Sequence, residues 1–352
     1  MSVVYFNCTS FYDDMENSQQ NVLPSTSRIT YTSWAPQTQG NQRFNFGVDS
    51  SPIEEESVEA LIELLHKTWT IYGVSTLFNF HRDEIHLKQY SKKLREEVAA
   101  TLAQEDVIYT AKMNIMDHIT VKTSSVDPIP IKIEVHAKNY GKENSINKCI
   151  YTGILLSWRT TTNELATPNS IRLPLLLCRG TKSSMVTIHN LLSHMFDCMI
   201  IELPAQEDDL MWLIPIVIIP TNVEEQSKHT SEISMEYRIP DLPDTNAIVV
   251  KFQVLDLIKI LRVIMGNQSD GANVEISFHL EHIEKFRDIL YKQMLQTASL
   301  QLGLCLLRKI NLPSFTIMGN KMKVTNIETM NRVLLYLNEK AVRILHTLTS
   351  EI

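Results

Sequence analysis

Hydrophobic and polar positions change their period several times along this chain, and each change predicts a different element. Between residues 83 and 103 the apolar positions recur every three or four residues, which is typical of an amphipathic helix. Over 107–115 and 131–137 apolar and polar residues alternate, as in half-buried strands of an antiparallel sheet. The predicted inward face of the helix consists of Leu87, Tyr90, Leu94, Val98 and Leu102.

An earlier helix is predicted from its start signal. Ser51-Pro52-Ile53-Glu54 offers a capping serine, proline at the first helical position and glutamate at the third. Gly73 suits the C-terminal cap of this helix. Its predicted inward face consists of Val58, Leu61, Leu65, Trp69 and Tyr72.

The rest of the chain mixes the two periods without regular strand–helix–strand alternation, which favours an α+β fold. The run Leu210–Pro220, interrupted by Pro215, is interpreted as a buried strand. Further strands are predicted at 149–158, 171–177, 233–239, 247–254, near 304–310 and at 315–325. Further helices are predicted at 184–200, 255–265, 278–300 and 327–347.

The composition of the first 50 residues differs from that of the remainder. Residues 1–50 are rich in Ser, Thr, Asn, Gln and Asp without an apolar period, and we expect a disordered tail. The folded domain is predicted to cover 51–352. Because 221–230 is polar, this domain has the possible sub-lobes 51–225 and 230–352.

Composition excludes several classes of protein. The 352 residues include 44% hydrophobic and 21% charged ones, as in soluble globular proteins. The net charge is −7, so any contact with DNA requires a local basic patch. Five cysteines lack CxxC spacing, which argues against a zinc site or a disulfide framework. We find no secretory signal, and the longest apolar run is too short for a membrane span.

Signatures of catalysis are incomplete. Gly180-Thr181-Lys182-Ser183 resembles the end of a phosphate-binding loop, but the upstream glycine is absent. His279 and His282 lie three residues apart without the HExxH order or a third metal ligand. We therefore predict no catalytic residues, no metal and no cofactor. A nucleotide- or metal-dependent enzyme remains the alternative of lowest weight.

Basic residues near the C-terminus form a more suggestive pattern. Gly319-Asn320 predicts a hairpin turn, after which Lys321 and Lys323 project from one face of a strand. Arg308 lies on the preceding strand, and Lys148 precedes another. Cations on one strand face suit a row of phosphates. The spacing alone favours ordinary solvated residues of the sheet over a phosphate-binding row.

Several blocks of sequence, in the correct order, resemble the centromere protein L (CENP-L) family of the inner kinetochore. They are LLHKTWTIYGVSTLFNF at 64–80, KCIYTG at 148–153, the block from Leu173 through Trp212, and MKVTNIETMNRVLLYLNEKAV at 322–342. The resemblance spans most of 58–348. It implies a large, curved, mostly antiparallel sheet backed by helices.

The resemblance also implies a function. Members of the family pair with centromere protein N (CENP-N), join the constitutive centromere-associated network in the nucleus, and help form a positively charged DNA channel. We therefore expect a non-enzymatic scaffold subunit at the centromere and kinetochore that binds centromeric DNA without sequence specificity. The alternative is a partner-binding module that does not touch DNA. The implied DNA-binding residues are Lys148, Arg308, Lys321 and Lys323, and the implied partner-binding residues are Ile233, Met235, Tyr237, Val249 and Phe252.

Overall fold

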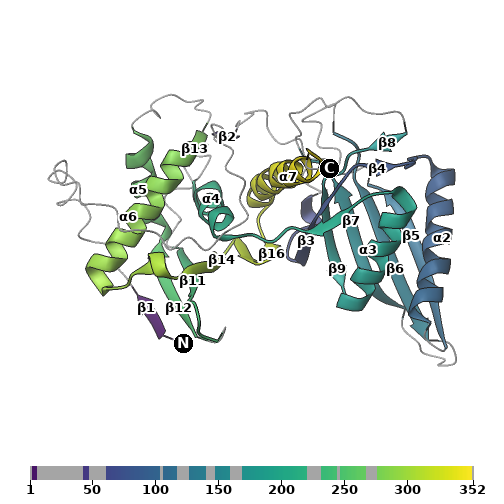
Figure 1. The fold of residues 1–352 in the computed structure, drawn as a ribbon, viewed down its shortest axis with the longest axis horizontal. Helices are drawn as coiled ribbons and strands as arrows, with labels where there is room; N and C mark the ends of the chain where they lie inside the picture. The colour runs from purple at the N-terminus through teal and green to yellow at the C-terminus, as the bar shows by residue number, and fades with distance from the viewer. Residues whose placement is uncertain are drawn as a thin grey trace. The chain divides into compact units, whose positions relative to one another are not determined.

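The computed structural model describes residues 2–5, 43–46, 61–103, 106–116, 127–139, 147–158, 169–219, 231–243, 246–266 and 276–350. These residues form two compact units. Unit 1 combines residues 1–50 with 218–306, and unit 2 combines 51–217 with 307–352. Each unit has its own strands and its own helices (Figure 1).

Unit 2 is built on a large, open sheet in which all adjacent strands are antiparallel. The strand order is β14-β15-β16-β3-β9-β7-β6-β5, and the short β10 (Ile200–Glu202) also pairs with β3. The strands are β3 (Thr68–Val74), β5 (Val107–Ile115), β6 (Ile131–Asn139), β7 (Lys148–Leu156), β9 (Leu175–Gly180), β14 (Leu306–Asn311), β15 (Phe315–Met318) and β16 (Lys321–Val324). A small pair, β4 (Leu77–Phe78) and β8 (Ser170–Ile171), lies outside this sheet.

Two helices cover one face of this sheet. They are α2 (Glu84–Leu102) and α3 (Lys182–Phe196), and both were predicted from their apolar period (Figure 1). Asp83 and Thr181 cap them by accepting hydrogen bonds from the amides of His86 and Ser184. The core on this face joins helix side chains to the alternating inward side chains of the strands. It includes Leu94, Val98, Ile188, Leu192, Ile133, Val135 and Leu176.

The helix α7 (Ile327–Ser350) packs against β3, β9 and β16. Trp69, Ile71 and Met322 are buried, and they alternate along their strands with the residues of the α2–α3 face. A second helix in this region, α4 (Glu207–Ile218), replaces the strand predicted over Leu210–Pro220. That prediction was wrong.

The helix α4 forms because its two ends are satisfied. Three acidic residues occupy its first turn, where their negative charges interact favourably with the helix dipole. One of them, Asp209, accepts a hydrogen bond from the Gln206 amide at 2.8 Å. The Ile216 carbonyl accepts a hydrogen bond from Arg332 of α7. Pro215 removes one intrahelical bond, but beyond its first turn the helix is apolar on every side and mostly buried, so packing outweighs that loss. Within the described ranges no helix is both long and apolar enough to span a bilayer.

The helix predicted to run from Ser51 to Gly73 is also corrected. Residues 51–60 lie outside the described part of the chain; residues 61 and 62 are helical, and the chain enters β3 at Thr68. The segment TWTIYGV is rich in aromatic and β-branched residues, and β3 has pairing partners along both of its edges. As a result Trp69 and Tyr72, predicted to share one helix face, lie on opposite faces of the sheet.

Unit 1 carries three strands that pair in the order β1-β12-β11. Its strands are β11 (Glu232–Arg238), β12 (Ala247–Gln253) and the N-terminal β1 (Ser2–Tyr5). The helices α5 (Val254–Met265) and α6 (Leu280–Ala298) lie beside one another, and the Tyr291 ring of α6 contacts Tyr237 of β11 with a centroid separation of 6.5 Å (Figure 1). The strand β13 (Ile276–His279) pairs with β2 (Arg43–Phe46).

The units divide the chain differently from the sub-lobes 51–225 and 230–352. Because β16 pairs with β3, residues 307–352 belong with the first part of the folded chain. The polar segment 221–230 lies outside the described residues. Within 1–50, where the composition predicts a disordered tail, the structure describes the two strands β1 and β2, and the rest of that segment is not among the described residues.

Candidate nucleic-acid interface

The β15–β16 hairpin presents two lysines on one face of the unit 2 sheet. Lys321 and Lys323 are exposed, whereas Met322 and Val324 are buried on the opposite face. Gly319 has a positive φ of 56°, as the predicted hairpin turn requires. Two residues along a strand span about 7 Å. The hairpin therefore fixes the spacing of the two ammonium groups more closely than a flexible loop would.

Backbone hydrogen bonds hold this hairpin in place at three points. The Ile71 amide donates to the Asn320 carbonyl at 2.8 Å, and the Ala205 amide donates to the Gly319 carbonyl at 2.9 Å. At the other end of β16, the His66 amide donates to the Val324 carbonyl at 2.8 Å. The strand that carries both lysines is thus fixed along its whole length.

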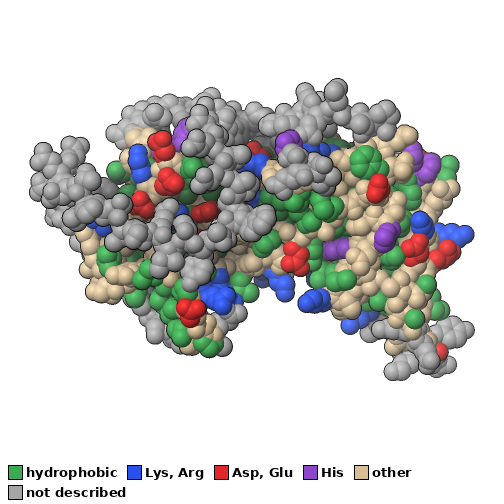
Figure 2. Space-filling view, viewed as in Figure 1, with side chains coloured by type: hydrophobic (Ala, Val, Ile, Leu, Met, Phe, Trp, Pro, Cys, Tyr) green, Lys and Arg blue, Asp and Glu red, His purple; other side chains and the backbone are tan. Residues whose placement is uncertain are grey.

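Strand pairing extends the basic surface beyond β16. Lys321 lies opposite Met318, and Met318 lies opposite Lys309, so all three residues share one face. Arg308 precedes Lys309 and therefore starts from the other side of β14, but its guanidinium reaches Met318, with Nη2 3.8 Å from the sulfur. We call Lys309, Lys321 and Lys323, together with Arg308, the basic sheet face. Figure 2 shows blue side chains below β16 and β3 in this region.

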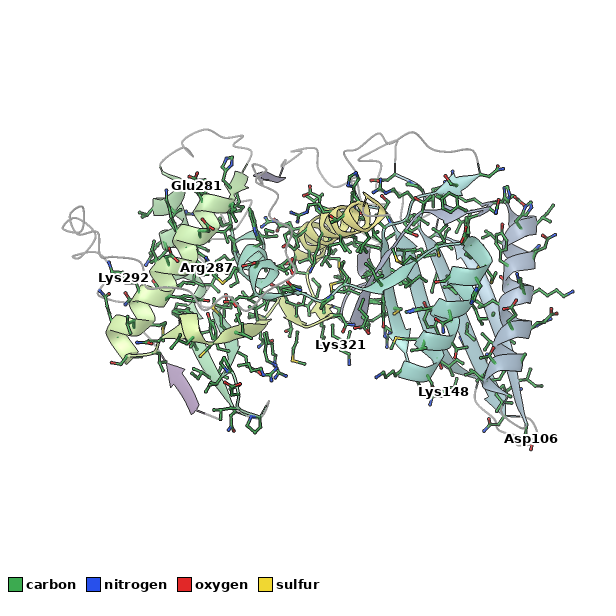
Figure 3. All side chains as sticks on the ribbon, viewed as in Figure 1. Asp106, Lys148, Glu281, Arg287, Lys292 and Lys321 are labelled. Carbon is green, nitrogen blue, oxygen red and sulfur yellow. The ribbon has the colours of Figure 1, made fainter. Side chains whose placement is uncertain are left out.

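Lys148, the fourth predicted DNA-binding residue, stands apart from the basic sheet face. It is exposed at the first position of β7, which is three strands away from β16. Three steps between strands correspond to about 14 Å. Figure 3 shows Lys148 and Lys321 on the same margin of unit 2. The structure thus brings three predicted residues, Arg308, Lys321 and Lys323, close together and places Lys148 at a distance.

An acidic residue that the sequence did not indicate lies near the basic sheet face. Glu202 of β10 is exposed and pairs with Tyr72, two positions along β3 from the Thr70 that pairs with Lys321. Among the described carboxylates, none forms an ion pair with Lys321 or Lys323. Both lysines can therefore engage an external anion without first breaking an internal contact.

The five predicted partner-binding residues occupy the interior of unit 1. Their exposed fractions range from 0% for Ile233, Met235 and Tyr237 to 6% for Val249, with Phe252 at 3%. Ile233 lies opposite Phe252 across the β11–β12 ladder, and Tyr237 packs on α6. These side chains hold β11 and β12 in place. A strand added at the edge of this sheet would pair with backbone rather than with them, and the partner contact remains a prediction.

Comparison with known proteins identifies the family. The family model of Centromere protein L matches residues 63–342, which include the β15–β16 hairpin, Lys148 and most of α7. This match covers most of the chain. The chain belongs to the Centromere protein L family.

Individual relatives are distant. The chain is 25% identical to Centromere protein L of Rattus norvegicus over 157 residues and 24% identical to that of Homo sapiens over 167 residues. These matches cover 43% and 46% of this chain, and 45% and 48% of the two relatives. The match to Centromere protein L of Gallus gallus is longer, with 25% identity over 247 residues, 65% of this chain and 69% of the relative. The chain thus spans about half the length of the two mammalian relatives.

The other candidate sites have local structural roles in this family member. The Thr181 hydroxyl caps α3 and lies 2.7 Å from the Ser184 hydroxyl. The His279 amide donates to Nδ1 of His282 at 3.4 Å, at the start of α6. In the described part of the chain, no three His, Cys, Asp or Glu side chains are grouped as a metal site requires.

The burial of His189 makes the stability of this family member depend on pH. His189 of α3 packs between the rings of Tyr72 and Tyr151, with centroid separations of 4.5 and 5.8 Å. Burial lowers the pKa of His189 from 6.5 to about 4. Burial raises the pKa of the neighbouring Tyr72 and Cys178 to about 12, so both stay neutral.

The folded state therefore binds fewer protons at His189 than the unfolded state does. The contribution of neutral His189 to the free energy of unfolding is fully present above pH 6.5. It is lost as the pH falls from 6.5 toward 4, and the loss is about 2 kcal/mol at pH 5. We expect His189→Phe to remove most of this loss in urea unfolding measured at pH 7.5 and pH 5. Replacing the exposed His194 on the same helix is the control and should leave the loss intact. An equal loss in His189→Phe would contradict the assignment.

Proposed function

We propose that this chain is a non-enzymatic scaffold subunit of the inner kinetochore, acting at the centromere in the nucleus. It pairs with CENP-N, joins the constitutive centromere-associated network and contacts centromeric DNA without sequence specificity. In this way it supports kinetochore assembly and chromosome segregation. The observation that carries the proposal is the family match over 63–342 together with the fixed basic sheet face that lies inside it.

The shape of the basic sheet face supports contact with phosphates rather than reading of bases. Two exposed lysines project from one face of a strand, and such a row of charges suits a row of phosphates. Lysine binds phosphate as a point charge, and the favourable free energy of binding comes mainly from the release of counterions from the DNA. The overall charge of −7 opposes DNA binding by the isolated chain. DNA binding is therefore a property of the assembly with CENP-N, in which further basic residues are added.

The first experiment is co-expression of the full chain with CENP-N of the same organism, followed by size exclusion with light scattering. A stable one-to-one complex is the expected result. Exclusive elution of both proteins as separate species would overturn the proposed pairing. The alternative enzyme class is tested on the same material, because nucleotides or divalent metals that raise the melting temperature would favour it.

A single charge change near the lysines should strengthen DNA binding by the assembly. Glu202→Lys removes the exposed carboxylate beside Lys321 and adds a cation on that side of β3. One additional phosphate contact steepens the slope of log K against log salt by about 0.9. We expect this change in binding titrations with a labelled duplex. The matched control is Glu96→Lys on the exposed side of α2, and an equal gain in both variants would indicate net charge alone.

A further inference from the structure

The N-terminal strand lies at one edge of the three paired strands of unit 1. β1 pairs with β12 in parallel, with Ser2, Val3, Val4 and Tyr5 opposite Ile248 to Lys251 (Figure 1). β12 pairs with β11 on its other side in an antiparallel ladder of seven residue pairs. β1 and β12 are separated by more than two hundred residues of sequence. A distant terminal segment thus completes this edge, as an added strand does in recognition by β-augmentation.

The cover that β1 provides is partial. Its ladder spans Ile248 to Lys251, whereas β12 extends from Ala247 to Gln253. Parallel pairing is also slightly less stable per residue than antiparallel pairing. A longer strand, or an antiparallel one, could therefore form more backbone hydrogen bonds with β12 than β1 does.

The packing of β12 keeps the strand edge that β1 covers in an extended conformation. Val249, Val250 and Phe252 are buried, so β12 is anchored from within unit 1. An extended edge of this kind carries unpaired amides and carbonyls when it is uncovered, and proteins protect such edges against unwanted pairing. β1 supplies that protection from within the chain.

We propose that β1 is a built-in competitor for the strand-binding edge of β12, and that an extended segment of CENP-N takes its place in the heterodimer. This inference rests on the proposed pairing with CENP-N and specifies its site. In the free subunit β1 closes the edge. Because only the open form binds, the apparent affinity is reduced by the open fraction.

The test replaces residues 2–5 with a Gly-Ser segment of equal length in the full chain and measures the affinity for CENP-N by titration. If the edge is open about one-tenth of the time, removal of β1 tightens binding about tenfold. Hydrogen exchange of the amides of 247–253 provides a second readout. Protection of this segment should fall in the free variant and return when CENP-N is added.

The same replacement of residues 43–46 is the matched control, because β2 is a strand of equal length that pairs with β13 rather than β12. It should leave the affinity unchanged. If the wild type binds CENP-N and loss of β1 leaves the affinity unchanged or weakens it, the competitor role is overturned while the heterodimer stands. If no variant binds CENP-N, the proposed pairing itself fails, and the competitor role fails with it.

Discussion

Lys340→Met should lower the free energy of unfolding by about 3 kcal/mol, because it leaves a carboxylate in the interior without its cation. Lys340 of α7 is 7% exposed, and its ammonium lies 2.6 Å from Oδ2 of Asp209 at the start of α4. The Tyr336 hydroxyl donates to the other carboxylate oxygen at 2.8 Å. The change is measured by urea unfolding at pH 7.5.

The size of this effect comes from the unpaired partner rather than from the pair itself. Adding Asp209→Asn to Lys340→Met removes the uncompensated charge and should restore at least half of the loss, as a double-mutant cycle would show. Lys93→Met is the surface control, because the Lys93–Glu97 pair is exposed and 3.9 Å apart, and it should change stability by less than about 0.5 kcal/mol. A loss below about 1 kcal/mol in Lys340→Met would show that Asp209 remains well solvated.

The same contact shows why part of the fold could not be predicted from sequence. Asp209 accepts a hydrogen bond from the Gln206 amide, a contact between near neighbours in the chain. Its ion pair with Lys340 joins residues that are distant in the chain, and no local pattern indicates it. The apolar run that follows fits either a buried strand or a buried helix, and the contacts of α7 with α4 decide between them.

Predictions that rested on long local patterns were confirmed. The helices α2 and α3 follow from their apolar period, and the alternation in β5 and β6 follows from period two. The helix predicted up to Gly73 failed because its apolar spacing also fits a strand. In β3 pairing with neighbours on both edges favours the strand, whereas the start signal at 51–54 lies outside the described residues.

For the candidate site, too, local features could be predicted from sequence and contacts between strands could not. Gly319-Asn320 and the alternation after it predict where Lys321 and Lys323 point, and both lysines are exposed as expected. The alignment of Lys309 with Lys321 depends on the register of three strands, which sequence does not reveal. Glu202 could not be located for the same reason, since only its pairing with Tyr72 brings it near the lysines.

Charge reversal of the hairpin lysines tests the DNA-binding part of the proposal. Lys321→Glu combined with Lys323→Glu should weaken duplex binding by the CENP-N assembly about ten- to a hundredfold at low salt. It should also reduce the slope of log K against log salt by about 2, because two phosphate contacts are lost. Met322 and Val324, which anchor β16, are unchanged, so the melting temperature should stay close to that of the wild type.

The matched control is Lys92→Glu with Lys93→Glu, which changes the net charge equally on the exposed side of α2. That helix packs against β5, which lies five strands from β16, or about 24 Å away. A specific role for the basic sheet face requires the hairpin variant to lose affinity while the α2 variant does not. Equal losses would indicate a long-range effect of net charge. If both variants bind DNA as the wild type does, the chain is better described as a partner-binding module that leaves DNA to other subunits.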